Sequence, residues 1–255
     1  NSNTAGPFAF EMGGCNLTDF QKNGTVFTGA GLVLNVHDCT VAGKGQTLVT
    51  AQNGLQAGDL ASATIANTVV SGCYWMGGTW TASGMLLYGL PSLSVSGGSV
   101  QGSQSSIYVY DCSGTIAGCD VQTPSGGGLG AWGIGAYNFN TSLAAKAGGR
   151  TMPHPQPFDV ELGGGGAKRS TSFTMTVTGG CITGPGVAGT TGVDVWSDGG
   201  AMTANVSGAE ITGWDYGIAA GGAGGVTTHV TGNAVTGNAS AGYWGDVGLM
   251  HDAVN

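Results

Sequence analysis

Charged residues are scarce in this chain, and basic residues are the scarcest. Only 8% of the 255 residues are charged, with six Lys and Arg against fourteen Asp and Glu, so the formal net charge is −8. A soluble globular domain ordinarily carries about 25% charged residues. The lack of a basic stripe argues against a nucleic-acid partner. No apolar run approaches the roughly 18 residues that a transmembrane helix needs, so the sequence predicts no membrane span.

Motifs for metal binding and for export are also missing. The chain has no CxxC pair and no His-x-x-x-His spacing, so we predict neither a metal site nor a cofactor. It has no signal peptide and begins at Asn1 rather than Met, which indicates a processed or excised piece of a larger precursor. Six cysteines in a chain of low charge nevertheless favour an oxidising compartment.

Five Asn-x-Ser/Thr sequons favour secretion if the source is eukaryotic. The acceptor residues are Asn16, Asn23, Asn140, Asn205 and Asn238. Together with the cysteine usage, they predict a protein that is secreted, extracellular, or exposed on a virion or cell surface.

Glycine is the residue that the chain has in excess, with 52 of 255 positions. No G-X-Y period is present, which excludes collagen, and an apolar content of 41% argues against disorder. This composition fits an all-β chain of many short strands and tight turns best.

A repeat of variable spacing runs through the sequence. Its constant element is an aliphatic residue, four other residues, a second aliphatic, one residue, and then usually glycine. Seven clean copies begin at Val36, Ile65, Val95, Ile116, Val177, Val206 and Val230, and a degraded copy begins at Met12. The second position between the aliphatics holds Asp38, Asn67, Gly97, Gly118, Gly179, Gly208 and Gly232. These residue types tolerate a left-handed backbone, so each copy reads as a strand, a sharp corner and a second strand.

Copies of this kind would stack about 4.8 Å apart as the rungs of a solenoid. The pattern resembles the right-handed parallel β-helix of the pectin-lyase-like superfamily. We therefore expect an all-β, single-stranded solenoid of about 7–8 rungs that forms one domain over residues 1–255. Residues 139–172 break the repeat and predict an irregular inserted loop or arm. The superfamily includes lyases, hydrolases, adhesins and viral spikes, so the resemblance leaves the activity open.

Aromatic residues gather in the segments that follow the repeat glycines. A third strand, aligned on its first inward residue, places aromatic rings at one outward position of four successive rungs. These rings belong to Tyr88, Tyr110, Tyr137 and Trp196, and the same exposed face should carry Tyr108, Asp194 and Asp198. Rings flanked by carboxylates suit a sugar-binding surface. Equally, the rings could form a subunit interface, where Tyr and Trp are enriched, or stack for structural reasons alone.

The sequence carries no complete catalytic set from the superfamily's enzymes. The Asn-x-Asp, Asp-Asp, Gly-His-Gly and Arg-x-Lys elements of polygalacturonases are absent, and no rung strand has the Arg base of pectate lyases. A glycoside hydrolase would need two carboxylates about 5–5.5 Å or 6.5–9.5 Å apart. The candidates are Asp111, Asp194 and Asp215, with His154 and Asp159 able to overhang them. The prediction leans away from an enzyme and keeps this Asp pair as the alternative.

The repeat also places the cysteines. Cys15 and Cys39 occupy one position on adjacent rungs, at a separation that a disulfide tolerates, and we predict that bridge. Cys112 and Cys119 could close a small loop, whereas Cys73 and Cys181 have no assigned partner.

The ends of a solenoid must be capped or paired, which favours an assembly role. The first hypothesis is an extracellular structural or adhesive β-helix, such as a fibre, spike or surface-assembly component. It would present the aromatic face to a neighbouring subunit or to a glycan. The alternatives are a carbohydrate-active enzyme that works on that face and a non-catalytic glycan-binding module.

Overall fold

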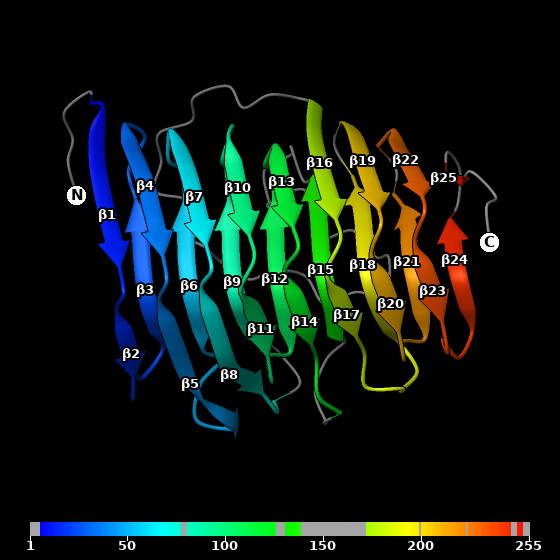
Figure 1. The fold of residues 1–255 in the computed structure, drawn as a ribbon, viewed down its shortest axis with the longest axis horizontal. Helices are drawn as coiled ribbons and strands as arrows, with labels where there is room; N and C mark the ends of the chain where they lie inside the picture. Colours follow the sequence, from blue (N-terminus) through cyan, green and yellow to red (C-terminus); the bar gives the residue numbers. More distant parts are fainter. Residues whose placement is uncertain are drawn as a thin grey trace.

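The protein is built from β-strands that lie side by side along its long axis (Figure 1). The computed structural model describes residues 6–77, 81–125, 131–138, 172–198, 200–222, 224–245 and 249–251. Within these ranges all regular structure is β, and the strands form three sheets with parallel pairing. The predicted all-β parallel solenoid is therefore confirmed.

The three sheets, here called A, B and C, each take every third strand. Sheet A consists of β1 (Phe8–Gly13), β4 (Leu32–His37), β7 (Ser62–Ala66), β10 (Leu93–Ser96), β13 (Gly114–Ala117), β16 (Ser172–Thr178), β19 (Ala201–Ser207), β22 (Val226–Thr231) and β25 (Leu249–His251). Sheet B consists of β2 (Asn16–Thr18), β5 (Thr40–Thr47), β8 (Val69–Trp75), β11 (Ser99–Gln101), β14 (Asp120–Gln122), β17 (Cys181–Thr183), β20 (Glu210–Thr212) and β23 (Ala234–Thr236). Sheet C consists of β3 (Asn23–Thr28), β6 (Asn53–Gly58), β9 (Ser83–Tyr88), β12 (Ser105–Tyr110), β15 (Ala131–Asn138), β18 (Thr190–Ser197), β21 (Tyr216–Gly221) and β24 (Ala241–Gly245).

One strand from each sheet makes a rung, so β1 to β24 form eight complete rungs and β25 begins a ninth. This agrees with the 7–8 rungs that the repeat predicts. The first aliphatics stack in register in sheet A as Met12, Val36, Ile65, Val95, Ile116, Val177, Val206 and Val230. The second aliphatics stack in sheet B as Leu17, Val41, Val70, Val100, Val121, Ile182, Ile211 and Val235. Both ladders line one hydrophobic core, which holds the three sheets together because it removes their apolar side chains from water.

The corner between sheets A and B has a left-handed residue in each described rung, and a second one, Gly98 or Gly180, follows it in two of them. All seven residues that the sequence assigns to this corner have φ between 48° and 62°. Asp38 and Asn67 take this conformation without being glycine, as short polar side chains tolerate it. The corner prediction is confirmed.

A second ladder of glycines lies near the start of the sheet C strands. At Gly192, an added Cβ would lie 2.6 Å from the carbonyl oxygen of Gly217 on the next rung and 2.6 Å from Cγ2 of Ile211. The equivalent glycines are Gly24, Gly54, Gly84, Gly133, Gly217 and Gly242. An added side chain would collide with the neighbouring rung at most of these positions, so part of the high glycine content has a packing cause.

Two neighbouring rungs each depart from one of these glycine positions. Ser106 stands in the sheet C glycine ladder, and Thr123 stands where the repeat has its usual glycine after the second aliphatic. Their hydroxyl oxygens are 3.0 Å apart and both side chains are buried. The two departures therefore satisfy one another by a hydrogen bond.

The stacking continues in register across the longest interval between repeats. β13, β14 and β15 pair with β16, β17 and β18, so the two sides of the interval are neighbouring rungs. The predicted irregular segment 139–172 lies outside the described residues, except for Ser172, which begins β16.

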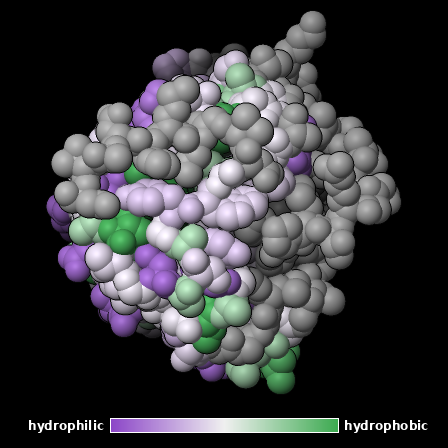
Figure 2. All heavy atoms as spheres, turned by 90° about the vertical axis from the view of Figure 1, so that its right-hand side faces the viewer, coloured by the Kyte–Doolittle hydropathy of each residue, from purple (hydrophilic) through white to green (hydrophobic). Residues whose placement is uncertain are grey.

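The two ends of the stack differ from its middle. Phe8 and Phe10 of β1 are 41% and 47% exposed, although their register neighbours in β4 are Leu32 and Leu34, which pack in the core or against it. At the end that carries β24, strongly hydrophobic residues form separate patches among polar ones (Figure 2). In the described part of the chain, no helix is long and apolar enough to cross a membrane.

Candidate functional site

The predicted aromatic ladder exists on the outer side of sheet C. Tyr88, Tyr110, Tyr137 and Trp196 are register neighbours in β9, β12, β15 and β18. The residues that alternate with them, such as Val109, belong to the solenoid core. The rings therefore project away from the core, as the alternation predicts.

The expectation that these rings are exposed is wrong. Five aromatic side chains form a second apolar cluster outside the core, with exposed fractions of only 3–7%. This aromatic cluster consists of Tyr88, Tyr108, Tyr110, Trp132 and Tyr137. Alternation along a strand tells which face a side chain takes, but it does not tell whether that face is covered.

Ring contacts tie the aromatic cluster together across three rungs. The Tyr88 and Tyr110 rings are stacked, with centroids 5.1 Å apart and planes 7° apart. The Tyr108 ring lies 5.0 Å from Tyr137 and 5.7 Å from Trp132. Contacts of this kind contribute about 0.5–1.5 kcal/mol each beyond area burial. Trp132 is a member that the ladder alignment missed, because it lies near the start of its strand rather than at the aligned position.

A buried carboxylate lies against the aromatic cluster. Asp194 has no exposed surface, and its Oδ2 accepts a hydrogen bond of 2.5 Å from the Tyr137 hydroxyl. Gly135 separates Tyr108 from Asp194 in the register. A Cβ on Gly135 would come within 2.5 Å of the Tyr137 ring and 2.6 Å of Trp132 Nε1, so this glycine makes room for the rings.

The two central phenols stay neutral at ordinary pH. Burial raises the pKa of Tyr137 well above its usual value of 10, and the negative charge of Asp194 raises it further. Burial also raises the pKa of Tyr108 well above 10, and the nearby acidic groups of Tyr110, Asp194 and Asp111 raise it further. Tyr137 therefore remains a hydrogen-bond donor to Asp194 over the physiological range.

The other predicted acidic residues have structural partners. Asp111 follows β12 in a left-handed corner with φ of 52°, and its amide donates to the Tyr137 carbonyl at 2.9 Å. Asp215 accepts a 2.7 Å hydrogen bond from the Gly189 amide. Asp198 accepts a 2.7 Å hydrogen bond from Nε1 of the half-buried Trp196.

The structure does not bring the predicted carboxylate pairs together. Asp215 directly precedes Tyr216, which pairs with Thr191, whereas Asp194 pairs with Ala219. The backbones of Asp194 and Asp215 are thus about four residues apart along the strands, or about 13 Å. Asp111 is also remote from Asp194. It lies two rungs away from β18, and its register there corresponds to Ser197, three residues beyond Asp194. His154 and Asp159 lie outside the described residues.

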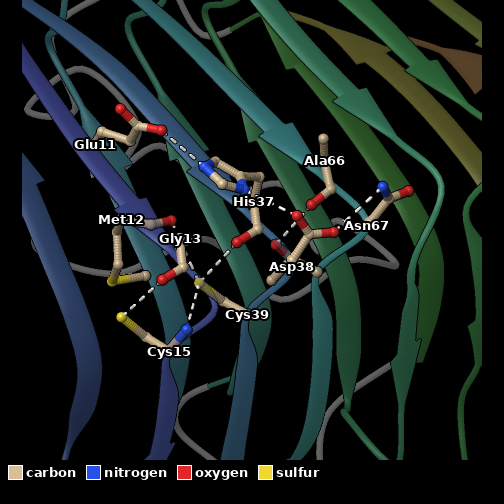
Figure 3. Close-up of polar contacts among 10 residues, drawn as sticks. Glu11, Met12, Gly13, Cys15, His37, Asp38, Cys39, Ala66 and Asn67 are labelled. Carbon is tan, nitrogen blue, oxygen red and sulfur yellow. Dashed lines mark hydrogen bonds and ion pairs between the residues drawn. The ribbon is translucent and has the colours of Figure 1, made fainter.

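No disulfide joins the six cysteines, all of which are described, so the predicted Cys15–Cys39 and Cys112–Cys119 bridges are wrong. The Cys39 sulfur turns inward and lies 3.2 Å from the His37 carbonyl, while the Cys15 amide donates to it at 3.4 Å (Figure 3). The Cys15 thiol instead approaches the Gly13 carbonyl at 3.5 Å. Equivalent positions on adjacent rungs bring two backbones close, but they do not aim the two sulfurs at each other.

Three of the thiols are held in the protonated form, which is a poor nucleophile. Burial raises the pKa of the Cys73 thiol to about 12, and burial with the nearby Asp120 charge does the same for Cys119. Cys181 is exposed, and its pKa is raised by desolvation and by the charges of Asp120 and Glu210. In the part of the chain that the structure describes, no group of three His, Cys, Asp or Glu side chains is placed to hold a metal ion.

The sequons differ in their accessibility. Asn16 in β2 is exposed, whereas Asn23 is half-buried. Asn205 donates to Thr176 at 3.5 Å, and Asn238 accepts the Trp214 amide at 2.9 Å. Asn140 lies outside the described residues.

A polar network at the corner of the second rung was not predicted as a site. His37 appears in the sequence as an ordinary surface residue, yet both of its ring nitrogens contact carboxylates (Figure 3). Glu11 comes from β1 and Asp38 from the corner that follows β4. Sequence spacing cannot reveal this network because its members come from two different rungs.

Comparisons of this chain with protein-family models, with curated proteins and with solved structures found no match.

Proposed function

We propose that this protein is an extracellular structural or adhesive β-solenoid, a component of a fibre, spike or surface assembly. The observation that carries the proposal is the open first rung. Each of β1, β2 and β3 has a pairing partner on one side only among the described strands. Unpaired strand edges are templates for pairing with another chain.

The side chains of the first rung support the same proposal. Phe8 and Phe10 occupy inward register positions but remain exposed, and Phe10 contacts Phe27 with ring centroids 5.3 Å apart. A neighbouring β-rung placed on this end would pair three strands and cover these rings in one step. The gain would combine backbone hydrogen bonds with apolar burial worth about 25 cal/mol per Å².

The acidic residues support a structural role rather than a catalytic one. Asp194, Asp198 and Asp215 each accept a hydrogen bond from a tyrosine, a tryptophan or a backbone amide. Membership of the pectin-lyase-like superfamily is part of the proposal. The proposal also includes secretion. The exposed Asn16 sequon and the low charge support secretion, whereas the cysteines do not, because they form no disulfide.

A glycan-binding role is the second candidate. Trp244 is 37% exposed on the outer side of sheet C, and its ring lies 6.2 Å from that of Tyr216. Exposed rings of this kind can cover the apolar face of a sugar. A glycan array should then show hits that weaken in Trp244→Ala; an array without hits, or hits that the substitution leaves unchanged, would count against this candidate. Release of reducing ends from a polysaccharide panel, abolished in Asp194→Asn, would instead favour a glycosidase.

The assembly proposal is tested by size measurements over a range of concentrations. Light scattering coupled to size exclusion, with electron microscopy, should show assemblies joined at the solenoid end. The double variant Phe8→Glu/Phe10→Glu should disperse them without changing the circular dichroism spectrum. Val69→Glu is the matched control, because Val69 is 38% exposed on the outer side of β8, away from the end. Isolated particles at every concentration would overturn the proposal.

A further inference from the structure

The His37 imidazole bridges two carboxylates at the junction of the first two rungs. Nε2 lies 2.8 Å from Oε1 of Glu11 in β1, and Nδ1 lies 2.9 Å from Oδ2 of Asp38 (Figure 3). Asn67, at the corner of the third rung, donates from Nδ2 to Oδ1 of Asp38 at 3.4 Å. The network thus runs from the first rung to the third.

The protonation state of His37 follows from these distances. A neutral imidazole has one N–H donor and one acceptor nitrogen, whereas an ionised carboxylate only accepts. Only the imidazolium form donates to both carboxylates. With a neutral ring, one nitrogen lone pair would face a carboxylate oxygen at hydrogen-bonding distance, and that contact would be lost.

Among the described residues, no positively charged side chain is recorded in contact with the His37 ring. On sheet A its register neighbours are Gly13 in β1 and Ala66 in β7. A Cβ on Gly13 would lie 2.4 Å from Cε1 of the ring, so the imidazole rests directly over the first rung. The titratable groups around it are Glu11 from β1, Asp38 from its own corner, and the thiols of Cys15 and Cys39 beneath the corner.

We propose that Glu11, His37 and Asp38 form a pH-dependent latch, which fastens the first rung to the second while His37 is protonated and loosens it when His37 loses its proton. The device is local, because β1 is the edge strand of sheet A and only its partner β4 holds it among the described strands. Deeper rungs pair on both sides.

The pH window follows from the direction of each shift. Hydrogen bonds to Asp38 and then Glu11 raise the pKa of His37 above its usual 6.5. Its stabilisation is therefore fully present below pH 6.5 and is lost as the pH rises through the higher pKa of the folded state. The hydrogen bond to His37 lowers the pKa of Asp38 below 3.8, so that contribution is lost only as the pH falls through this lower value. The contact between His37 and Asp38 is therefore complete between these limits.

The latch can be measured by hydrogen exchange without reference to assembly. The readout is the protection factor of the β1 amides, corrected for intrinsic exchange and compared with β10 in the same sample. Between pH 5.5 and pH 8, β1 protection should fall about two- to fivefold while β10 stays constant, as expected for exposed ion pairs. His37→Gln should remove this pH dependence, and Glu11→Gln should reduce it.

Lys44→Met is the matched control, because Lys44 Nζ makes another ion pair between the first two rungs, at 3.3 Å from Oδ1 of Asp19. The variant leaves Glu11, His37 and Asp38 in place, so it should loosen the rung while the pH dependence stays as in the wild type. Constant β1 protection in the wild type, or an unchanged pH profile in His37→Gln, would overturn the latch.

If the first rung is also the assembly edge, assembly should weaken over the same pH range, a consequence that rests on the proposed function. Light scattering at pH 5.5 and pH 8 reports this separately. A pH-dependent β1 without assemblies would retain the latch and reject the assembly role. Assemblies with a pH-independent β1 would do the reverse.

Discussion

Leu34 and Phe10 occupy the same register position one rung apart, yet their environments are opposite. Leu34 is 1% exposed in the core, whereas Phe10 is 47% exposed at the end of the stack. Neither the strand nor the direction of the side chain accounts for the difference. A position in this solenoid becomes core only when a rung covers it on each side, so stability must vary from the middle of the stack to its end.

The largest expected effect contrasts these two positions directly. Leu34→Ala should lower the free energy of unfolding by about 2–5 kcal/mol, because it empties a fully packed site. Phe10→Ala removes a larger side chain but should cost under about 1 kcal/mol in the monomer, since much of the ring is already in water. Urea unfolding at low protein concentration measures both. Equal losses would show that the first rung is packed as firmly as the second.

The glycine ladder provides the next contrast. Gly192→Val should destabilise the protein by about 1–3 kcal/mol or more, because the new side chain strikes the backbone of the neighbouring rung. The same substitution at Gly242, in the last complete rung, should be milder, since the nearest atom to an added Cβ is 3.4 Å away. Thermal unfolding of the two variants compares them. A Gly242→Val loss as large as that of Gly192→Val would mean that the end is as confined as the middle.

A smaller contrast lies within the aromatic face itself. Tyr137→Phe removes the donor to the buried Asp194 carboxylate and should cost about 1–3 kcal/mol. Trp196→Phe removes the hydrogen bond to Asp198 at a half-exposed position and should cost under about 1 kcal/mol. Urea titration at neutral pH gives both values. The burial argument fails if Tyr137→Phe is the milder of the two.

Most of the fold could be predicted from the sequence, because the same spacing of two aliphatics around a corner residue recurs in every repeat. The spacing of aliphatics such as Val36 and Val41, with Asp38 between them, determines two strands and the corner that joins them. Pairing in register then follows, since every rung offers the same apolar positions to the next. The prediction covered the two aliphatic ladders, the left-handed corners and the outward direction of the aromatic rings.

The properties of the site were much less predictable, because they depend on side-chain contacts between rungs and on whether other residues bury the outer face of sheet C. The outward direction of Tyr110 followed from alternation, but its burial did not. Trp214 also follows a repeat glycine, and it lies fully inside the core with Nε1 donating to the Ile182 carbonyl at 3.0 Å. The bridging of His37 by Glu11 depends on two side chains 26 residues apart, for which no local pattern exists.

The in-register pairing of β13 to β15 with β16 to β18 has a further consequence for how such a chain can change. The second aliphatics Val121 and Ile182 are direct partners although 61 positions separate them, whereas Val100 and Val121 are partners over 21. We call the segment that leads from the end of one sheet B strand to the next repeat copy the return. The pairing of the rungs therefore does not depend on the length of the return. This architecture can therefore accept insertions and deletions in the returns without a change of fold. A single residue added between the two aliphatics would instead move the inward side chains of the second strand to its outer face. Foreign sequences could therefore be grafted into the returns, with the two aliphatic ladders kept unchanged as the scaffold.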